Sequence, residues 1–145
     1  MGSSYIDYRE GGFWCRNSSA ELWLYLLSEE AGAVADRPTW LAEAGAEWRL
    51  QATAAGGVSP ALDKYLGTDP GRVETVVALS DRVSERLHRW SPAIPKEIVN
   101  GWGTGGAGTR YCRSVDTAWM LRFGDAFHRL LRGTLGADPH ATTMY

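Results

Sequence analysis

The most continuous hydrophobic stretch of the chain, residues 22–27, follows a helix-start signal, Ser18-Ser19-Ala20-Glu21. This pattern is a capping box, in which the Ser18 hydroxyl accepts from the Glu21 amide and the Glu21 carboxylate accepts from the Ser18 amide. We therefore predict a helix over residues 21–31. Because this helix is apolar nearly all round, we expect protein to surround it.

Apolar residues recur at intervals of three and four along several further segments, which is typical of amphipathic helices. Start and stop signals, among them Thr39, Ser59-Pro60 and Asp69-Pro70, set the expected boundaries. The predicted helices cover residues 39–55, 60–66, 70–90 and 114–132. On the last of them, the expected core face is Val115, Trp119, Phe123, Ala126, Phe127 and Leu130. For the core as a whole, the large residues expected are Trp23, Trp48, Val76, Leu87, Trp119, Phe123 and Phe127.

Two segments, residues 5–17 and 91–113, lack a helical pattern. Residues 5–9 alternate as in an extended chain, and Gly11-Gly12 then breaks the segment. The second segment contains Pro92 and Pro95 and the glycine loop GWGTGGAG at residues 101–108. The predicted fold class is all-α: a compact bundle of four to five helices with an extended N-terminal segment and a Gly-rich loop before the last helix. We expect a single domain over residues 1–145, with flexible ends at 1–4 and 136–145.

Composition and charge remove several functional classes. The formal net charge is −2 and the isoelectric point is about 5.9, so there is no overall basic field for nucleic acid or an anionic membrane. No apolar run approaches the roughly 20 residues of a membrane helix, and no signal peptide is visible. Two cysteines, Cys15 and Cys112, cannot build a disulfide framework. The expected location is the cytoplasm, and the oligomeric state stays open.

The residue usage adds two indications about the kind of protein. Thirteen Arg against two Lys is the usage associated with a high-GC bacterium. Seven Trp residues are many for this length, and each has a large apolar area and one N–H donor. Basic residues gather in the second half of the chain, where we interpret them first as solvated helix faces and only second as a patch for an acidic partner.

Residues 103–108 match the G-x-G-x-x-G pattern of dinucleotide-binding loops. That function needs a strand before the loop and a helix that starts at it. Here the preceding segment is broken by prolines, and the helix starts about six residues late. The pattern therefore favours either a flexible loop or a loop whose glycines let the backbone approach another element closely. We predict no cofactor.

Two acid-x-x-His pairs, Glu85 with His88 and Asp125 with His128, resemble the ligand spacing of di-metal helical bundles. On a helical wheel, however, both pairs lie far from the apolar stripe of their helix, so all four residues should face water. We predict no metal site. The chain also lacks a nucleophile motif such as G-x-S-x-G, and we predict no catalytic residue.

The two non-helical segments share a short pattern, Trp14-Cys15-Arg16-Asn17 and Tyr111-Cys112-Arg113-Ser114. Chance and shared helix-entry chemistry explain so short a match most simply. The functional alternative is that both helix entries converge on one concave surface with the composition of a ligand pocket or interface hot spot. The candidate binding residues are Tyr5, Asp7, Arg9, Trp14, Trp102, Arg110, Tyr111 and Arg113.

Two functions remain open from the sequence. The first is a non-catalytic bacterial binding protein, of an immunity or regulatory type, that contacts another protein through an aromatic and arginine surface. The second is a small-molecule-binding protein or cofactor-free enzyme with a pocket between residues 5–16 and 100–113, for an anionic or aromatic ligand. The lack of a coherent acid–base or metal set favours the first function and a protein that is not an enzyme.

Overall fold

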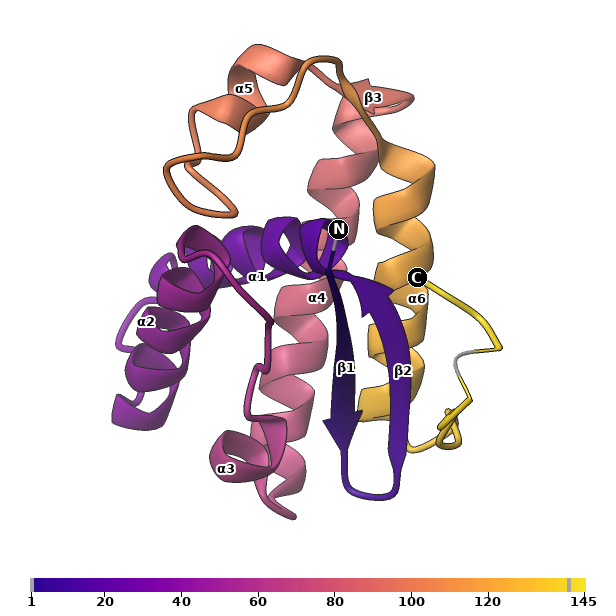
Figure 1. Ribbon diagram of the computed structural model, residues 1–145. Helices are drawn as coiled ribbons and strands as arrows, with labels where there is room; N and C mark the ends of the chain where they lie inside the picture. The colour runs from indigo at the N-terminus through magenta and orange to yellow at the C-terminus, as the bar shows by residue number, and fades with distance from the viewer. Residues whose placement is uncertain (1, 141) are drawn as a thin grey trace.

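The computed structural model describes residues 2–140 and 142–145. Along the chain, the elements are β1 (Ser3–Tyr8), β2 (Gly11–Arg16), α1 (Asn17–Gly32), α2 (Thr39–Thr53), α3 (Leu62–Leu66), α4 (Pro70–Trp90), β3 (Ala93–Ile94), α5 (Lys96–Asn100), β4 (Val115–Asp116) and α6 (Thr117–Leu131). Helix α1 starts at the upper end of the β1–β2 hairpin and crosses the middle of the molecule (Figure 1). Helices α4 and α6 run side by side on one flank, and α2 lies on the other.

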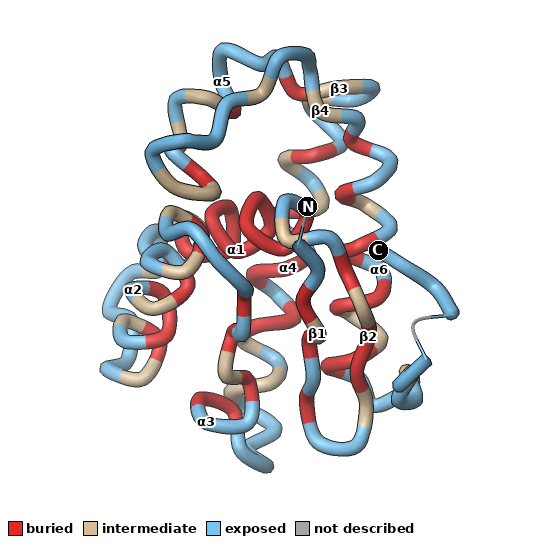
Figure 2. The backbone as a smooth tube through the Cα atoms, in the orientation of Figure 1, coloured by how far each residue is buried: buried red, intermediate tan, exposed pale blue. Residues whose placement is uncertain are grey.

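Helix α1 is the centre of the core. All of residues 19–28 are buried, and Figure 2 shows this segment as an almost continuous buried coil. Helices α2, α4 and α6 and both strands of the hairpin all contact it. The prediction of a central helix that is surrounded by protein is therefore confirmed.

The predicted capping box at the start of α1 is wrong. The helix begins at Asn17, and no side chain caps its first turn. The reason is that β2 runs directly into α1, so backbone groups satisfy the entry: the Asn17 amide donates to the Gly2 carbonyl (3.1 Å). Ser18 lies inside the helix, and the Glu21 side chain is free to point elsewhere.

The all-α prediction is also wrong in part. The molecule is mostly helical, with four long helices, but residues 3–16 form a two-stranded antiparallel hairpin. Its core face is Ile6 and Tyr8 on β1 and Phe13 and Cys15 on β2, all buried. Gly11 and Gly12, which seemed to break the segment, begin β2 instead.

Close packing explains the two glycines of β2. A Cβ on Gly12 would collide with the Tyr5 ring, and one on Gly11 would collide with the Leu135 carbonyl oxygen. Arg9, in the hairpin turn, has a positive φ of 54°. Neither feature matches the usual Asn-Gly signal of a two-residue hairpin, so the sequence did not reveal the turn.

A second, smaller hairpin joins the end of α4 to the start of α6. Ala93 pairs with Asp116, and Ile94 pairs with Val115. The Thr117 amide and hydroxyl both donate to the Pro92 carbonyl, each at 3.0 Å. This closure holds the intervening segment, α5 and the glycine loop, above one end of α1 (Figure 1).

The long helices α4 and α6 begin at acidic caps. Asp69 accepts from the amides of Gly71 and Arg72, as its position before Pro70 predicts. Asp116 accepts from the Ala118 amide. Most of the expected core residues are buried, namely Trp23, Trp48, Val76, Leu87, Phe123 and Phe127.

Trp119 is a correction to the predicted core. Its side chain is 42% exposed, whereas the neighbouring Met120 is 1% exposed. Four of the six predicted face residues, Phe123, Ala126, Phe127 and Leu130, are buried, but the buried face is turned toward Met120 and Leu131 and away from Trp119. Gly124 lets α6 approach α1, because a Cβ there would lie 2.7 Å from the Trp23 ring.

The two chain ends lie beside each other on the hairpin. Ser3 and Ser4 belong to β1, and Tyr145 hydrogen-bonds along β2. The flexibility expected for residues 1–4 and 136–145 stays a prediction, and Met1 and Ala141 lie outside the described residues. Within the described residues, no helix has the length and apolar composition needed to cross a membrane.

The orientation of α6 makes a testable difference between two aromatic residues. Phe123→Ala should lower the free energy of unfolding by about 3–5 kcal/mol, because it leaves a cavity against Phe13 and Trp23. Trp119→Ala should cost less than half as much, because much of the ring already faces solvent. Urea denaturation measures both values. Equal losses would show that Trp119 packs in the core after all.

Candidate functional site

The structure does not bring the candidate binding residues together on one surface. Asp7 and Arg9 lie near the turn of the β1–β2 hairpin, at the opposite end of the molecule from α5 and the glycine loop (Figure 1). Arg9 lies over the Tyr8 ring at 5.2 Å, and its amide donates to Asp63. Among the described residues, neither Asp7 nor Arg9 forms an ion pair.

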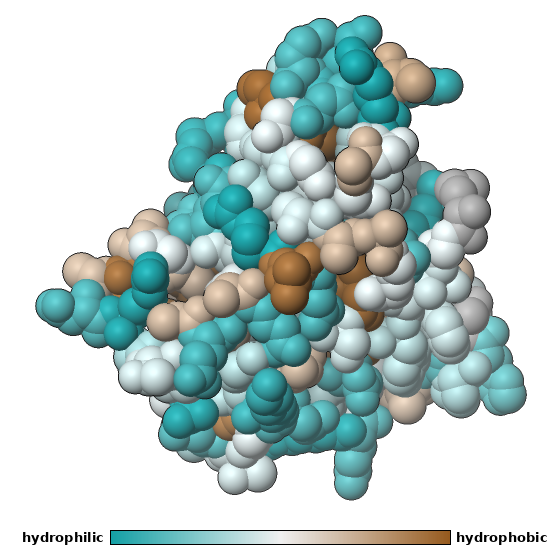
Figure 3. Space-filling view, turned by 60° about the vertical axis from the view of Figure 1, so that its left-hand side comes forward, coloured by the Kyte–Doolittle hydropathy of each residue, from teal (hydrophilic) through white to brown (hydrophobic). Residues whose placement is uncertain are grey.

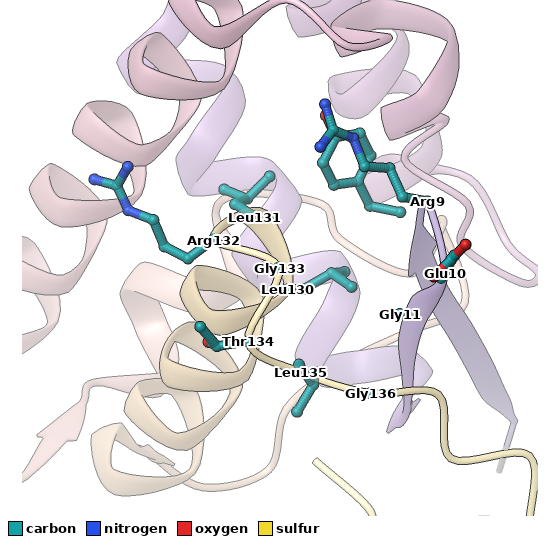
Figure 4. Close-up of a pocket in the computed structure, with 11 residues that line it drawn as sticks. Arg9, Glu10, Gly11, Leu130, Leu131, Arg132, Gly133, Thr134, Leu135 and Gly136 are labelled. Atoms are coloured by element: carbon teal, nitrogen blue, oxygen red, sulfur yellow. The ribbon is translucent and has the colours of Figure 1, made fainter.

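A cleft of about 610 Å³ lies between the hairpin turn and the end of α6. In Figure 4, the two guanidinium groups on its rim, those of Arg9 and Arg132, extend on opposite sides. Arg132 is already paired with Glu74. Most of the remaining lining is backbone and leucine side chains, so the cleft has no converging set of polar groups.

The other aromatic candidates form two stacks. Tyr5 and Trp14 pair across the hairpin at 5.1 Å between ring centroids. Trp102 stacks on Tyr25 of α1 at 5.2 Å and tilts against Trp90. Both stacks are half-buried packing contacts, while Arg110 and Arg113 are exposed on the chain that leads into β4.

The two helix entries do converge, but at only one point. Arg16, which ends β2, and Tyr111 line the same small cleft of about 140 Å³. Ser18 and Ser19 of α1 form one wall, and Trp119 of α6 forms part of the other. The residues that lie beside Tyr111 at this point are therefore Arg16 and Trp119, whereas the sequence pattern predicted Asp7 and Arg9 there.

An array of alternating aromatic rings and arginines extends from this cleft over the surface of α6. The Arg16 and Arg122 guanidinium carbons lie 5.1 and 5.3 Å from the Trp119 ring centroid. Arg122 also lies 5.9 Å from the Tyr145 ring. We call Arg16, Trp119, Arg122 and Tyr145 the Trp119 array. Its contacts are cation–π interactions, worth about 0.5–1 kcal/mol each at an exposed site.

The Trp119 array is fixed to the core through the C-terminus. The Tyr145 amide donates to the Trp14 carbonyl (3.0 Å), and the Arg16 amide donates to the Tyr145 carbonyl (2.8 Å). The Tyr145 ring also packs edge-on against Phe13, at 5.3 Å between centroids. The position of the array is therefore set by its attachment to the hairpin.

A second group of polar atoms is buried behind Tyr111. Glu21 of α1 is 6% exposed and Thr104 of the glycine loop is 3% exposed. The Thr104 and Tyr111 hydroxyls are buried without a hydrogen-bond partner, although the two side chains lie close together. Glu21 forms no ion pair among the described residues. We call Glu21, Thr104 and Tyr111 the buried oxygen cluster.

The glycine loop covers this cluster by close backbone approach. Gly105 has a φ of +78°, and a Cβ there would lie 3.0 Å from Glu21 Oε2 and 2.8 Å from Thr109 Oγ1. Gly106 has a φ of +88°, and a Cβ there would lie 3.2 Å from the backbone nitrogen of Ala55, just after α2. The Gly105 amide donates to the Ala52 carbonyl (2.9 Å). The prediction that these glycines permit close approach is confirmed.

Burial shifts the acid–base chemistry of the buried oxygen cluster. Loss of solvent raises the pKa of Glu21 above its ordinary value, with no hydrogen bond to oppose it. Burial also raises the pKa of Tyr111, more than the nearby Thr104 hydroxyl lowers it. A carboxyl group with a raised pKa in an enclosed site is a frequent property of functional residues.

The other titratable groups give weaker candidates. Glu85, His88 and Asp125 are exposed, as the helical wheel predicts, but His128 is half-buried, and its Nδ1 lies 3.7 Å from Asp81 Oδ1. In the part of the chain that the structure describes, no three His, Cys, Asp or Glu side chains are placed to hold a metal ion. Burial raises the pKa of Cys15 to about 12, which suppresses the thiolate needed of a nucleophile.

Sequence reasoning missed Glu21, Thr104, Arg16 and Arg122. The sequence did contain a sign that Glu21 is buried, because this charged residue directly precedes the apolar residues 22–27. The capping-box pattern, however, gave it a simpler role. The spacing of Met120, Phe123 and Phe127 would have turned Trp119 outward. No sequence signal places Thr104 over Glu21.

Comparison with protein-family models, with curated proteins and with solved structures finds no match to this chain.

The Glu21 carboxyl makes a pH-dependent contribution to stability whose sign follows from its raised pKa. The folded protein holds the Glu21 proton more tightly than the unfolded chain does, so this contribution is fully present below pH ~4. It is lost as the pH rises through the folded-state pKa. Gln is always neutral, so Glu21→Gln should become more stable relative to the wild type as the pH rises from 4 to 8.

Thermal or urea unfolding at several pH values measures this difference, with exposed Glu85→Gln as the matched control. The Glu85 variant gives the effect of the same substitution at an exposed position of α4. A Glu21→Gln protein that loses stability relative to the wild type with rising pH would show that the ionised carboxylate is stabilised by the fold.

Proposed function

We propose that this protein is a non-catalytic binding module of the bacterial cytoplasm that docks on an acidic surface of another protein through the Trp119 array. The observation that carries the proposal is that Trp119 is 42% exposed yet held between two arginines. A large aromatic residue on an otherwise well-packed helix has no structural need to face solvent.

The composition of the array supports a role in binding. Trp, Tyr and Arg are the residue types most enriched among the few interface residues that contribute most binding energy. Their arrangement is also held in place, because Tyr145 is fixed to β2 and Arg122 is held between two rings. A surface that is ordered in advance loses less side-chain entropy on association.

The charges around the array favour an acidic partner. Neither Arg16 nor Arg122 forms an ion pair with a carboxylate among the described residues. The nearby acids are engaged, since Asp116 caps α6 and Asp125 pairs with Arg129 at 3.6 Å. Two free guanidinium groups beside an exposed ring favour carboxylates opposite them.

Other surfaces of the molecule fit this role less well. The face on the side of α2 shows small hydrophobic spots scattered among hydrophilic residues (Figure 3). Leu50 of α2 is 67% exposed, but no arginine–aromatic stack surrounds it in the described structure. Single exposed apolar residues of this kind are normal on protein surfaces.

The alternative is the small-molecule-binding protein or cofactor-free enzyme. The buried oxygen cluster favours it, because a carboxyl with a raised pKa lies next to two hydroxyls without partners. The cluster shares Tyr111 with the cleft beside Trp119, so both candidate functions use the same end of α1.

Site-specific photocrosslinking tests the protein-binding proposal in cells. A photoreactive amino acid at position 119 should crosslink to a defined protein, whereas the same group at position 50 should not, although it is more exposed. Adding Arg16→Ala and Arg122→Ala to the position-119 variant should remove the crosslink.

The captured protein should then bind the purified module with an affinity that falls with salt and drops about tenfold for each arginine removed. Equal crosslinking at positions 50 and 119, or crosslinking that ignores both arginines, would contradict the proposal.

A further inference from the structure

We propose that the buried oxygen cluster is a binding site for a small organic ammonium ion, with the Glu21 carboxylate as its counter-ion. This inference is independent of protein docking by the Trp119 array. It starts from three oxygen-bearing side chains, Glu21, Thr104 and Tyr111, that come from α1 and the glycine loop and are enclosed together.

The first step is that the cluster is unsatisfied as it stands. Buried polar side chains nearly always have a hydrogen-bond partner, and each exception needs a reason. Here two hydroxyls lack a partner, and Glu21 has no cation within ion-pair distance among the described residues. Arg49 of α2 lies farther along α1, where it contacts the Tyr25 ring and donates to Ser28.

The second step is the chemistry of the missing partner. A carboxylate and two hydroxyl oxygens can all accept hydrogen bonds, and a primary ammonium group has three N–H donors and no acceptor. A cation would also remove the cost of burying an unpaired carboxylate. An anion would be repelled by Glu21, and a neutral apolar ligand would give none of the three side chains a hydrogen-bond partner.

The third step is the aromatic surroundings. Tyr111 belongs to the cluster, and Tyr25 lies one helical turn after Glu21, on the same face of α1. Tyr25 stacks on Trp102, which comes from the start of the glycine loop. Aromatic rings beside a carboxylate are the usual surroundings of bound alkylammonium groups.

The fourth step is access, which the glycine loop controls. Gly105 lies close to the carboxylate, since a Cβ there would lie 3.0 Å from Glu21 Oε2, so the glycine loop forms one wall of the site. Gly103, Gly105 and Gly106 all have positive φ, and residues 107–110 are exposed. Asn100 clamps the loop base through two bonds to the Tyr111 backbone (2.9 and 2.8 Å), so the loop can open without loss of its anchor.

Binding of an ammonium ion should be linked to the ionisation of Glu21. The ion binds the carboxylate form, while burial favours the protonated form in the free protein. Tyr111 faces Glu21 from the loop, Tyr25 lies beside it on α1, and Arg49 reaches Tyr25 from α2. Because none of these groups supplies a positive charge to Glu21, affinity should increase from pH 5 to pH 8.

Nuclear magnetic resonance titration of the full chain tests the site with three probes: methylammonium, n-butylammonium and guanidinium. At least one should shift the amide signals of Gly103, Gly105 and Gly106 in a saturable way, with a Kd of about 10 mM or lower. n-Butanol and acetate, which lack the positive charge, should not.

Variants separate the proposed site from nonspecific binding. Glu21→Gln should weaken binding at least tenfold and remove its pH dependence, and Tyr111→Phe, which deletes only the hydroxyl, should weaken it several-fold. Leu50→Ser, on an exposed part of α2, should bind as the wild type does. Absence of saturable shifts with all three probes, or equal affinity in Glu21→Gln, would overturn the proposal and leave the docking function of the Trp119 array untouched.

Discussion

The burial of α1 on all sides is the constraint on which the rest of the structure depends. Residues 19–28 have no face toward solvent, so every other element must supply a covering surface for this helix. Helix α2 covers one side, α4 and α6 cover another, and the hairpin closes a third. Hydrophobic contact over so large an area provides most of the driving force for folding. It also explains why Gly124 and the two glycines of β2 lie where chain segments approach closely.

On a helix with no solvent-facing side, any charged residue is buried, and burial of an unpaired charge costs free energy. Glu21 lies in this position, and the glycine loop encloses it further. Loop closure over a carboxyl group raises its pKa and leaves two hydroxyls without partners. The same closure brings Tyr111 beside the first turn of α1, where it borders the cleft next to Trp119. The Trp119 array and the buried oxygen cluster thus both result from the way in which one end of α1 is covered.

Local patterns in the sequence predicted what depends on local physics. The Asp69-Pro70 start of α4, the apolar run of α1 and the outward direction of Glu85 and His88 follow from capping, composition and helical periodicity. The hairpin was missed because Gly11-Gly12 resembled a break, whereas these glycines admit Tyr5 and the Leu135 carbonyl, which are distant in sequence. The outward position of Trp119 and the enclosure of Glu21 likewise depend on long-range packing. No local pattern contains that information.

The central claim is that α1 contains a buried carboxyl group with no cation to balance it. The most direct measurement is a pH titration of the Glu21 side-chain carboxyl carbon by nuclear magnetic resonance, assigned with the Glu21→Gln protein. The structure predicts a midpoint clearly above the value of about 4.3 that is usual for glutamate. A midpoint at or below that value would contradict the account, because it would show that the carboxylate is hydrated or paired in the folded protein.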